Sequence, residues 1–367
     1  MTKSIILFTV VFINFSILAQ ENKHHLLIGT YTNTCESDGI YVYDFDSTTG
    51  KAQLKSSTKG IVNPSYLTIS EDKTKVYSVN EAGDKSQVSV FNYSATSGTL
   101  ELLNQVDAHG ADPCYITATD ENIIVATYSG GTISIFDKKP NGELLFQQVF
   151  KHNGKSINQE RQEKSHLHMV QLAPDKKHLL ATDLGADFIY SYKFNTKERN
   201  NTLSFGNAIK IKPGSGPRHF SFSPNGNYLY LINELDGSLD VFKYKNGNLK
   251  LIQETSIVAN DFKGNTSAAD IHVSSDGKFL YATNRGDANT ISCFEIKKNG
   301  KLKFKQTLNT LGKGPRNFTI DPSGKFLLVA HQYTNNVVIF NVDKQTGMLT
   351  DTGNRIELCS PVCLVFE

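Results

Sequence analysis

Ten side chains that could do acid–base or anion-binding chemistry stand at two recurring places, the start of one short strand and the end of the next. A carboxylate or an imidazole can act as a general base, and a guanidinium can hold a developing negative charge or clamp a carboxylate or phosphate. A purely structural scaffold does not need such a dense group of ionisable residues, and such groups tend to mark functional sites. The candidates are His166, His168, Arg218, His219, His272 and Arg316 at strand starts, and Glu81, Asp183, Glu234 and Arg285 at strand ends.

Three short patterns recur along the chain and predict the strands that carry these residues. A Gly- or Asn-containing turn followed by an apolar residue marks one hairpin per repeat, because Gly and Asn tolerate the positive φ of tight turns. Its copies centre on Gly50, Gly98, Gly142, Gly247, Gly300 and Gly347, with a degenerate copy at Asn200 and Asn201. An apolar strand ending in polar residues and a short strand introduced mostly by Pro each occur seven times, for example LYLINE to Glu234 and PRHFSFS from Pro217.

Each repeat therefore reads as strand A, a turn, strand B, a loop, strand C, a hairpin and strand D. Repeats of roughly 50 residues with four short strands are typical of propeller blades. The chain starts with strands B, C and D of one blade and ends with a lone strand A at residues 361–367. We predict an all-β, seven-bladed β-propeller of four-stranded antiparallel blades, one domain over residues 20–367, whose last strand joins the first three. Residues 361–367 are expected to be ordered and essential for stability.

The predicted fold brings the candidate residues together. Strand A of each blade lines the central channel and strand D lies at the rim, so strand-A starts and strand-B ends collect at one mouth of the channel. Two loops, residues 151–164 and 258–267, lead into strand-A starts and should lie on the same face. They are either lids over the site or plain solvated loops, and both interpretations stay open.

The N-terminus is typical of an export signal. Lys3 is followed by an apolar run from Ser4 to Leu18, and Ala19 suits the cleavage position. We expect residues 1–19 to be removed and the mature chain to be periplasmic or secreted; a retained anchor helix is the alternative. No later segment is apolar enough to span a membrane.

Composition excludes several other classes of protein. The 38 Lys and Arg nearly balance the 36 Asp and Glu, and no basic stripe for nucleic acid is found. The five cysteines are odd in number and show no CxxC pair, so we expect small buried side chains and neither a disulfide nor a zinc site. No HExxH, GxSxG, GxGxxG or phosphate loop occurs. We expect no metal and no cofactor, and a monomer.

Several segments resemble the seven-bladed lactonase family, which includes bacterial 6-phosphogluconolactonases of the propeller type and the fungal carboxymuconate lactonising enzyme. The resemblance spans essentially the whole mature chain. It is carried by LLIGTYT near the start, SHLHMVQLAPDKKHLLATDLGAD from Ser165, GSGPRHFSFSPNGNYLYLINEL from Gly214, AADIHVSSDGKFLYATNRG from Ala268, GPRNFTIDPSGKFLLVAHQ from Gly314 and the final PVCLVF.

The resemblance implies a lactone-opening site built from a His, two Arg and a Glu. Its motifs place these at His166 or His168, Arg218, Arg285 and Glu234, and the small-molecule substrate would be a sugar lactone. An exported enzyme meets free sugar lactones or lactones of oxidised polysaccharide, so a preference for a phosphorylated lactone does not follow from the family alone. Two alternatives stay open, a muconate-lactonising isomerase and a non-catalytic binding propeller.

Overall fold

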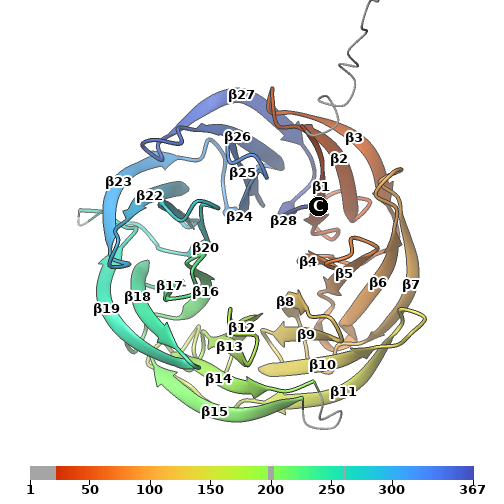
Figure 1. Cartoon of the computed structure of the whole chain (residues 1–367), viewed down its shortest axis with the longest axis horizontal. Coiled ribbons are helices and arrows are strands. Elements are labelled where there is room, and N and C mark those ends of the chain that lie inside the picture. The colour runs from red at the N-terminus through yellow and green to blue at the C-terminus, as the bar shows by residue number, and fades with distance from the viewer. Residues whose placement is uncertain (1–21, 197–201, 260) are drawn as a thin grey trace, which may run out of the picture.

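Seven four-stranded antiparallel sheets form a ring in the computed structural model, which describes residues 22–196, 202–259 and 261–367 (Figure 1). The predicted blade number and strand order are confirmed. The signal segment predicted at residues 1–19 and the degenerate turn copy at Asn200 and Asn201 lie outside the described residues. No helix among the described residues is long and apolar enough to cross a bilayer.

In six of the seven blades the strands follow chain order from the ring axis outward. Blade 1 contains β4 (Leu67–Ile69), β5 (Lys75–Asn80), β6 (Gln87–Tyr93) and β7 (Leu100–Asp107). Blade 2 contains β8 (Pro113–Ala118), β9 (Asn122–Thr127), β10 (Thr132–Lys138) and β11 (Leu144–Lys151). Blade 3 contains β12 (Leu167–Leu172), β13 (His178–Asp183), β14 (Phe188–Phe194) and β15 (Leu203–Lys210). Blade 4 contains β16 (Pro217–Phe222), β17 (Tyr228–Asn233), β18 (Ser238–Lys245) and β19 (Asn248–Ser256). Blade 5 contains β20 (Ala268–Val273), β21 (Phe279–Asn284), β22 (Thr290–Ile296) and β23 (Leu302–Asn309). Blade 6 contains β24 (Pro315–Ile320), β25 (Phe326–His331), β26 (Asn336–Val342) and β27 (Leu349–Glu357). A short 3-10 helix, η1 (Gly83–Lys85), follows β5.

Blade 7 joins the two ends of the chain. It consists of β28 (Pro361–Phe366), β1 (Lys23–Thr30), β2 (Ile40–Asp46) and β3 (Lys51–Thr58). The pairing is antiparallel, with Leu26 opposite Phe366 and Ile28 opposite Leu364. The prediction that the last strand completes the first blade is confirmed, and the ring therefore has no unpaired edge at its seam.

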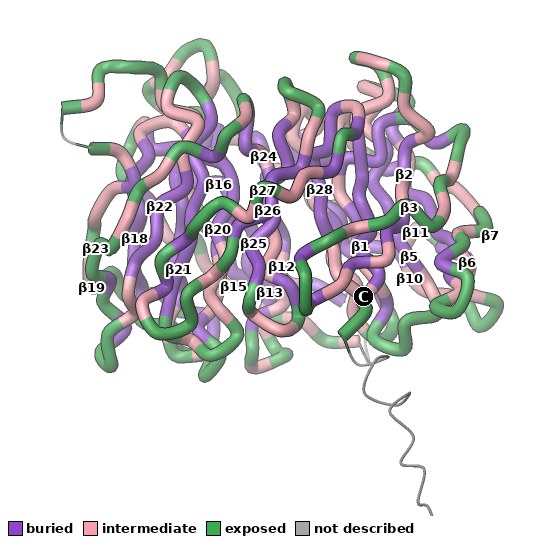
Figure 2. The backbone as a smooth tube through the Cα atoms, turned by 90° about the horizontal axis from the view of Figure 1, so that it is seen from above, coloured by how far each residue is buried: buried purple, intermediate pink, exposed green. Residues whose placement is uncertain are grey.

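Apolar side chains fill the interfaces between neighbouring blades. Each of the seven interfaces holds its own buried cluster, such as Leu26 and Phe45 of blade 7 packed with Phe326 and Leu328 of blade 6. Figure 2 shows the buried inner strands and the exposed turns and outer strands. Burying one such side chain contributes about 1.5–3 kcal/mol to the free energy of folding. The repeated interfaces therefore hold the inner strands, and the side chains at their starts, in fixed positions.

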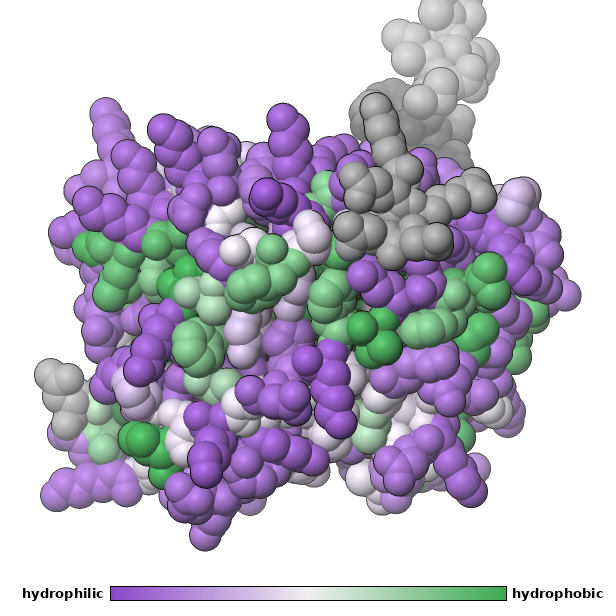
Figure 3. All heavy atoms as spheres, turned by 90° about the horizontal axis from the view of Figure 1, so that it is seen from below, coloured by the Kyte–Doolittle hydropathy of each residue, from purple (hydrophilic) through white to green (hydrophobic). Residues whose placement is uncertain are grey.

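The outermost strands also carry single exposed apolar residues around the rim. Figure 3 shows such groups scattered among polar side chains on one side of the ring. Around the whole ring, the apolar residues of the outermost strands that are 42–59% exposed are Leu54, Leu102, Leu145, Val149, Phe205, Leu251 and Phe304. Scattered surface residues of this kind are ordinary in soluble proteins.

One disulfide is present, which corrects the expectation that none would form. Cys35 follows β1 and Cys359 precedes β28, and the two are bonded although 324 positions separate them in the sequence. Ring closure brings these two loops side by side, which explains why spacing alone did not reveal the pair. The other three cysteines, Cys114, Cys293 and Cys363, are free and buried as expected.

Candidate active site

A cavity of about 350 Å³ opens where the starts of the inner strands meet the ends of the second strands. Five of the residues predicted for the site line it, namely Glu81, His168, Glu234, Arg285 and Arg316. The remaining lining residues are Asp112, Cys114, Tyr128, Ser129 and Arg161.

A bulge at the start of each of several inner strands turns one side chain out of the regular alternation. In β12 the register against β13 skips His168, in β16 it skips Arg218, and in β24 it skips Arg316. Corresponding irregularities occur at Cys114 in β8 and just before Ile271 in β20. Because a bulge inserts one unpaired residue and re-aims its side chain, the same position in successive blades supplies residues to one mouth.

Glu234 is the centre of the charged cluster. Its Oε1 accepts from Arg161 Nη2 at 2.6 Å, and its Oε2 accepts from Arg218 Nε at 2.9 Å and lies 3.0 Å from Arg285 Nη2. The side chains of Glu234, Arg218 and Arg285 are all buried, and Arg161 is partly exposed. One carboxylate therefore holds three guanidinium groups, and the cluster keeps a net positive charge.

The electrostatics of this cluster fix the charge of Glu234. Burial alone would raise the pKa of the carboxyl group, but Arg285, Arg218 and Arg161 together lower it to about 2. Such a carboxylate is fully ionised at neutral pH and is a weak base. Its geometry suits it to orienting the arginines rather than to accepting a proton.

His168 is the histidine that reaches the cavity. Its Nδ1 lies 3.8 Å from Cys114 Sγ, and its ring stands edge-on to those of Tyr128 and His219. Burial lowers its pKa well below the usual histidine range, and the nearby Arg218 adds to this effect. His168 is therefore uncharged at neutral pH and can accept a proton.

His166, the other histidine of this strand start, is placed differently. It stacks on Tyr128 with ring centroids 4.3 Å apart, and its Nδ1 lies 3.0 Å from the Tyr128 carbonyl oxygen. Its Nε2 lies 3.2 Å from Glu163. His166 supports Tyr128 from behind and does not line the cavity.

The opposite side of the cavity combines Glu81, Tyr31 and Arg316. Burial raises the pKa of Glu81, an effect that Arg316 partly offsets, and the carboxylate accepts hydrogen bonds from Ser65 and from the Tyr31 hydroxyl. The Arg316 guanidinium lies over the Tyr31 ring, 5.4 Å from its centroid. Within the described ranges of the chain it makes no hydrogen bond or ion pair, so its donors are free for a ligand.

The remaining predicted residues lie outside the cavity lining. Arg218 and His219 are buried behind Glu234, and His272 binds Asp270 at 3.0 Å on the same inner strand. Asp183 is wholly buried and accepts from the backbone N–H groups of His166 and Ala186. Arg218 belongs to the charged cluster through its contact with Glu234, and the other three residues belong to the scaffold around the site.

The sequence prediction missed Arg161. Arg161 lies in the 151–164 loop, which is long and polar and leads into a strand start. Its guanidinium binds Glu234 and the Tyr128 hydroxyl, both from cavity-lining residues. The other loop, 258–267, contributes no lining residue from its described positions. Cys114 lines the cavity, but burial raises the pKa of its thiol so far that it is not a nucleophile at neutral pH.

Known proteins resemble the chain over nearly its full length. A family model described as "Lactonase, 7-bladed beta-propeller" matches residues 25–366. A Formosa agariphila protein named 6-phosphogluconolactonase is 38% identical over 88% of this chain and 94% of its own. A Bacillus subtilis protein of the same name is 32% identical over 92% of this chain and 97% of its own. The solved structure of a Pseudomonas aeruginosa periplasmic gluconolactonase is 33% identical, covers 94% of this chain and 99% of its own, and superposes with a TM-score of 0.90.

Proposed function

Because the chain belongs to the lactonase family of seven-bladed β-propellers, which makes it a hydrolase of lactone esters, we propose that it hydrolyses a sugar lactone in the cavity beside Glu234. One observation carries this proposal. An uncharged imidazole, His168, shares a cavity with guanidinium groups that a single ionised carboxylate holds in place. This pairing supplies a proton acceptor and a fixed positive field, the two requirements for opening a lactone with water.

The reaction can be written with these residues alone. His168 takes a proton from a water molecule as the water oxygen bonds to the lactone carbonyl carbon. Arg285 and Arg161 stabilise the oxyanion that forms. The bond from carbon to ring oxygen then breaks, and the ring oxygen takes the proton from His168. The product is a hydroxy acid, which loses one proton to solvent at neutral pH.

Substituting His168 by Gln is expected to lower kcat/KM for lactone hydrolysis on the order of a hundredfold or more, as loss of a general base does. Because the pKa of His168 is lowered, the wild-type rate should stay constant as the pH falls through 6.5 and decline only in more acidic solution. Proton release by purified residues 20–367 on gluconolactone and 6-phosphogluconolactone, corrected for spontaneous hydrolysis, measures both effects.

His166→Gln is the matched control, since it changes a neighbouring histidine outside the cavity and should keep most of the activity. Equal losses in the two variants would refute the assignment of the base to His168. No catalysis of either lactone by the folded wild-type protein would refute the proposed function itself.

We further propose that Arg316 binds an anionic group of the substrate, because its guanidinium is unpaired within the described residues and fixed over Tyr31. Arg316→Gln should raise KM about tenfold or more for a lactone with a phosphate or carboxylate, since a hydrogen bond to a charged group contributes about 1.5–3 kcal/mol. KM for gluconolactone should change little. Comparing 6-phosphogluconolactone, a glucaric acid lactone and gluconolactone identifies the group, and equal changes for all three would contradict this role.

We also propose that the enzyme is exported and acts on lactones outside the cytoplasm. Three observations support this: the apolar run before Ala19, the Cys35–Cys359 disulfide, which is typical of oxidising compartments, and the likeness to a periplasmic gluconolactonase. N-terminal sequencing of the protein recovered from the exported fraction of an expressing bacterium should begin at Gln20. Recovery of the uncleaved chain from the cytoplasm would contradict the proposal.

A further inference from the structure

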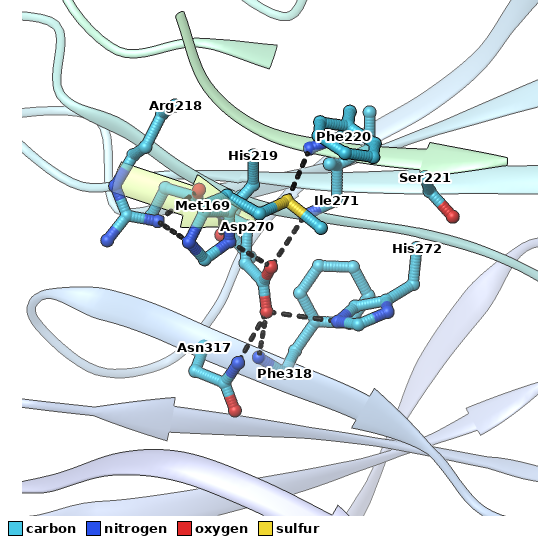
Figure 4. A network of polar contacts seen from close by, with 12 residues as sticks. Met169, Arg218, His219, Phe220, Ser221, Asp270, Ile271, His272, Asn317 and Phe318 are labelled. Atoms are coloured by element: carbon cyan, nitrogen blue, oxygen red, sulfur yellow. Dashed lines mark hydrogen bonds and ion pairs between the residues drawn. The ribbon is translucent and has the colours of Figure 1, made fainter. Parts of the chain in front are cut away.

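A single buried carboxylate, that of Asp270 in β20, gathers five hydrogen-bond donors outside the cavity lining (Figure 4). Its Oδ1 accepts from the backbone N–H of Ile271 at 3.0 Å and lies 2.8 Å from His219 Nδ1. Its Oδ2 accepts from Asn317 Nδ2 at 2.6 Å and from the backbone N–H of Phe318 at 3.2 Å, and lies 3.0 Å from His272 Nε2. A carboxylate so surrounded stays ionised, and His272 and His219 accordingly help to hold its pKa far below the usual value although burial opposes them.

These contacts connect the inner strands of four consecutive blades. His219 belongs to β16, Asp270 to β20 and Asn317 to β24. The side-chain oxygen of Asn317 accepts from the backbone N–H of Leu364 at 2.7 Å, and Leu364 lies in β28, the strand that closes the ring. Asp270 thus occupies a fixed position relative to four of the seven blades.

Asp270 determines which nitrogen of His219 carries the proton. An ionised carboxylate can only accept hydrogen bonds, so the His219 Nδ1 that faces it must carry hydrogen. His219 is also uncharged at neutral pH, because burial and the neighbouring Arg218 lower its pKa to about 4. The Nε2 atom therefore has a free lone pair, and it lies 3.4 Å from Arg218 Nη1.

Arg218 is consequently held on three sides. Its Nη1 donates to the Ala269 carbonyl oxygen and faces His219 Nε2, while its Nε donates to Glu234. In Figure 4 the guanidinium lies at one end of the chain of contacts that runs through His219 to Asp270. With the opposite tautomer, an N–H of His219 would point at an N–H of Arg218 and push the guanidinium away from Glu234.

We propose that Asp270 is a positioning residue for the lactonase reaction, which acts through His219 to fix Arg218 against Glu234. This inference rests on the proposed function. Arg218 does not line the cavity, but Glu234 and Arg285 do, so a shift of Arg218 changes the site through the carboxylate that all three arginines share. A misplacement of about 1 Å in such a group can cost on the order of a hundredfold in rate.

The experiment compares Asp270→Asn with Asp321→Asn. Asp321 is a second buried carboxylate, which accepts from the backbone N–H groups of Lys325 and Phe326 in the turn after β24, away from the cavity lining. We expect both variants to lose stability, because each leaves buried donors without their acceptor. Only Asp270→Asn should lower kcat, on the order of a hundredfold and with little change in KM, at temperatures where both proteins are folded. Equal kcat in wild type and Asp270→Asn would overturn the proposal.

Nitrogen NMR of protein labelled in its histidines tests the same link without any substrate. His219, assigned by the resonance missing in His219→Gln, should be uncharged with its proton on Nδ1 in the wild type and lose this single tautomer in Asp270→Asn. A wild-type His219 with its proton on Nε2 would overturn the proposal. Failure of the wild type to hydrolyse lactones would refute the proposed function but leave this result standing, so the two failures are distinguishable.

If Asp270→Asn does not fold, two substitutions of His219 serve instead. A Gln amide extends to the position of Nε2 and can still offer Arg218 an acceptor, whereas an Asn amide reaches only the Asp270 side. We expect His219→Gln to keep a kcat at least tenfold above that of His219→Asn. Equal values would mean that the contact with Arg218 has no role, and the proposal would fall.

Discussion

Glu234→Gln is expected to lower the free energy of unfolding by about 3–5 kcal/mol, the usual effect of removing one partner of a buried ion pair. Its two carboxylate oxygens hold Arg161, Arg218 and Arg285. Gln has the same shape but no charge, so it leaves two buried guanidinium groups without a counter-charge. The arginines then repel one another, and lactone hydrolysis should fall at least a hundredfold as their fixed geometry is lost.

Urea unfolding followed by circular dichroism measures the loss of stability, since the chain has no Trp for fluorescence. The matched control is Glu143→Gln, whose carboxylate pairs with Lys139 at 3.4 Å on the exposed surface. Surface pairs contribute little, so its unfolding midpoint should match that of the wild type. A Glu234→Gln protein with an unchanged midpoint would show that the cluster does not depend on this charge.

Deleting residues 361–367 is expected to abolish cooperative folding. The deletion removes β28, and with it the buried side chains of Val362, Cys363 and Leu364. Each buried aliphatic side chain contributes about 1.5–3 kcal/mol and each strand hydrogen bond about 1 kcal/mol. Their combined loss approaches the entire net stability of a typical domain, about 5–15 kcal/mol. It would also expose the edge of β1 and break the Asn317–Leu364 contact.

The informative comparison is with the double variant Cys35→Ser and Cys359→Ser, which keeps the strand and loses only the covalent link. Removing a native disulfide costs about 2–5 kcal/mol, so this variant should still unfold cooperatively, at lower urea concentration. Thermal and urea unfolding curves of the two proteins distinguish the effects. A truncated chain that unfolds with the wild-type midpoint would show that β28 is dispensable.

The number of blades and the pairing of the last strand with the first three could be predicted from the sequence, because both depend on short turn and strand patterns. Hairpin glycines such as Gly247 and Gly347 do adopt positive φ, at 76° and 74°, and a turn of this kind is specified by the residues within it. The incomplete blades at the two ends then leave one way to close the ring. Strand type and order were therefore recoverable without any knowledge of distant contacts.

The choice between His166 and His168 was not recoverable, since the two residues share a face in a regular strand. The bulge that selects His168 is defined by the register of β12 against β13, and nothing within the strand itself specifies it. Arg161 was missed for a related reason, because a loop's path over the cavity depends on tertiary packing. Asp183 is a candidate site residue on the sequence alone because, like Glu234, it ends a strand. In the structure its carboxylate accepts hydrogen bonds from backbone N–H groups and does not reach the cavity.

The Cys35–Cys359 bond also changes what a protease can do to the molecule. Covalently, residues 35–359 form a macrocycle. Exposed loop tips, which are the usual places for proteolytic nicking, nearly all lie within that circle. A single cut there opens the circle but releases no fragment, so a nicked molecule keeps all of its blades tethered until the bond is reduced.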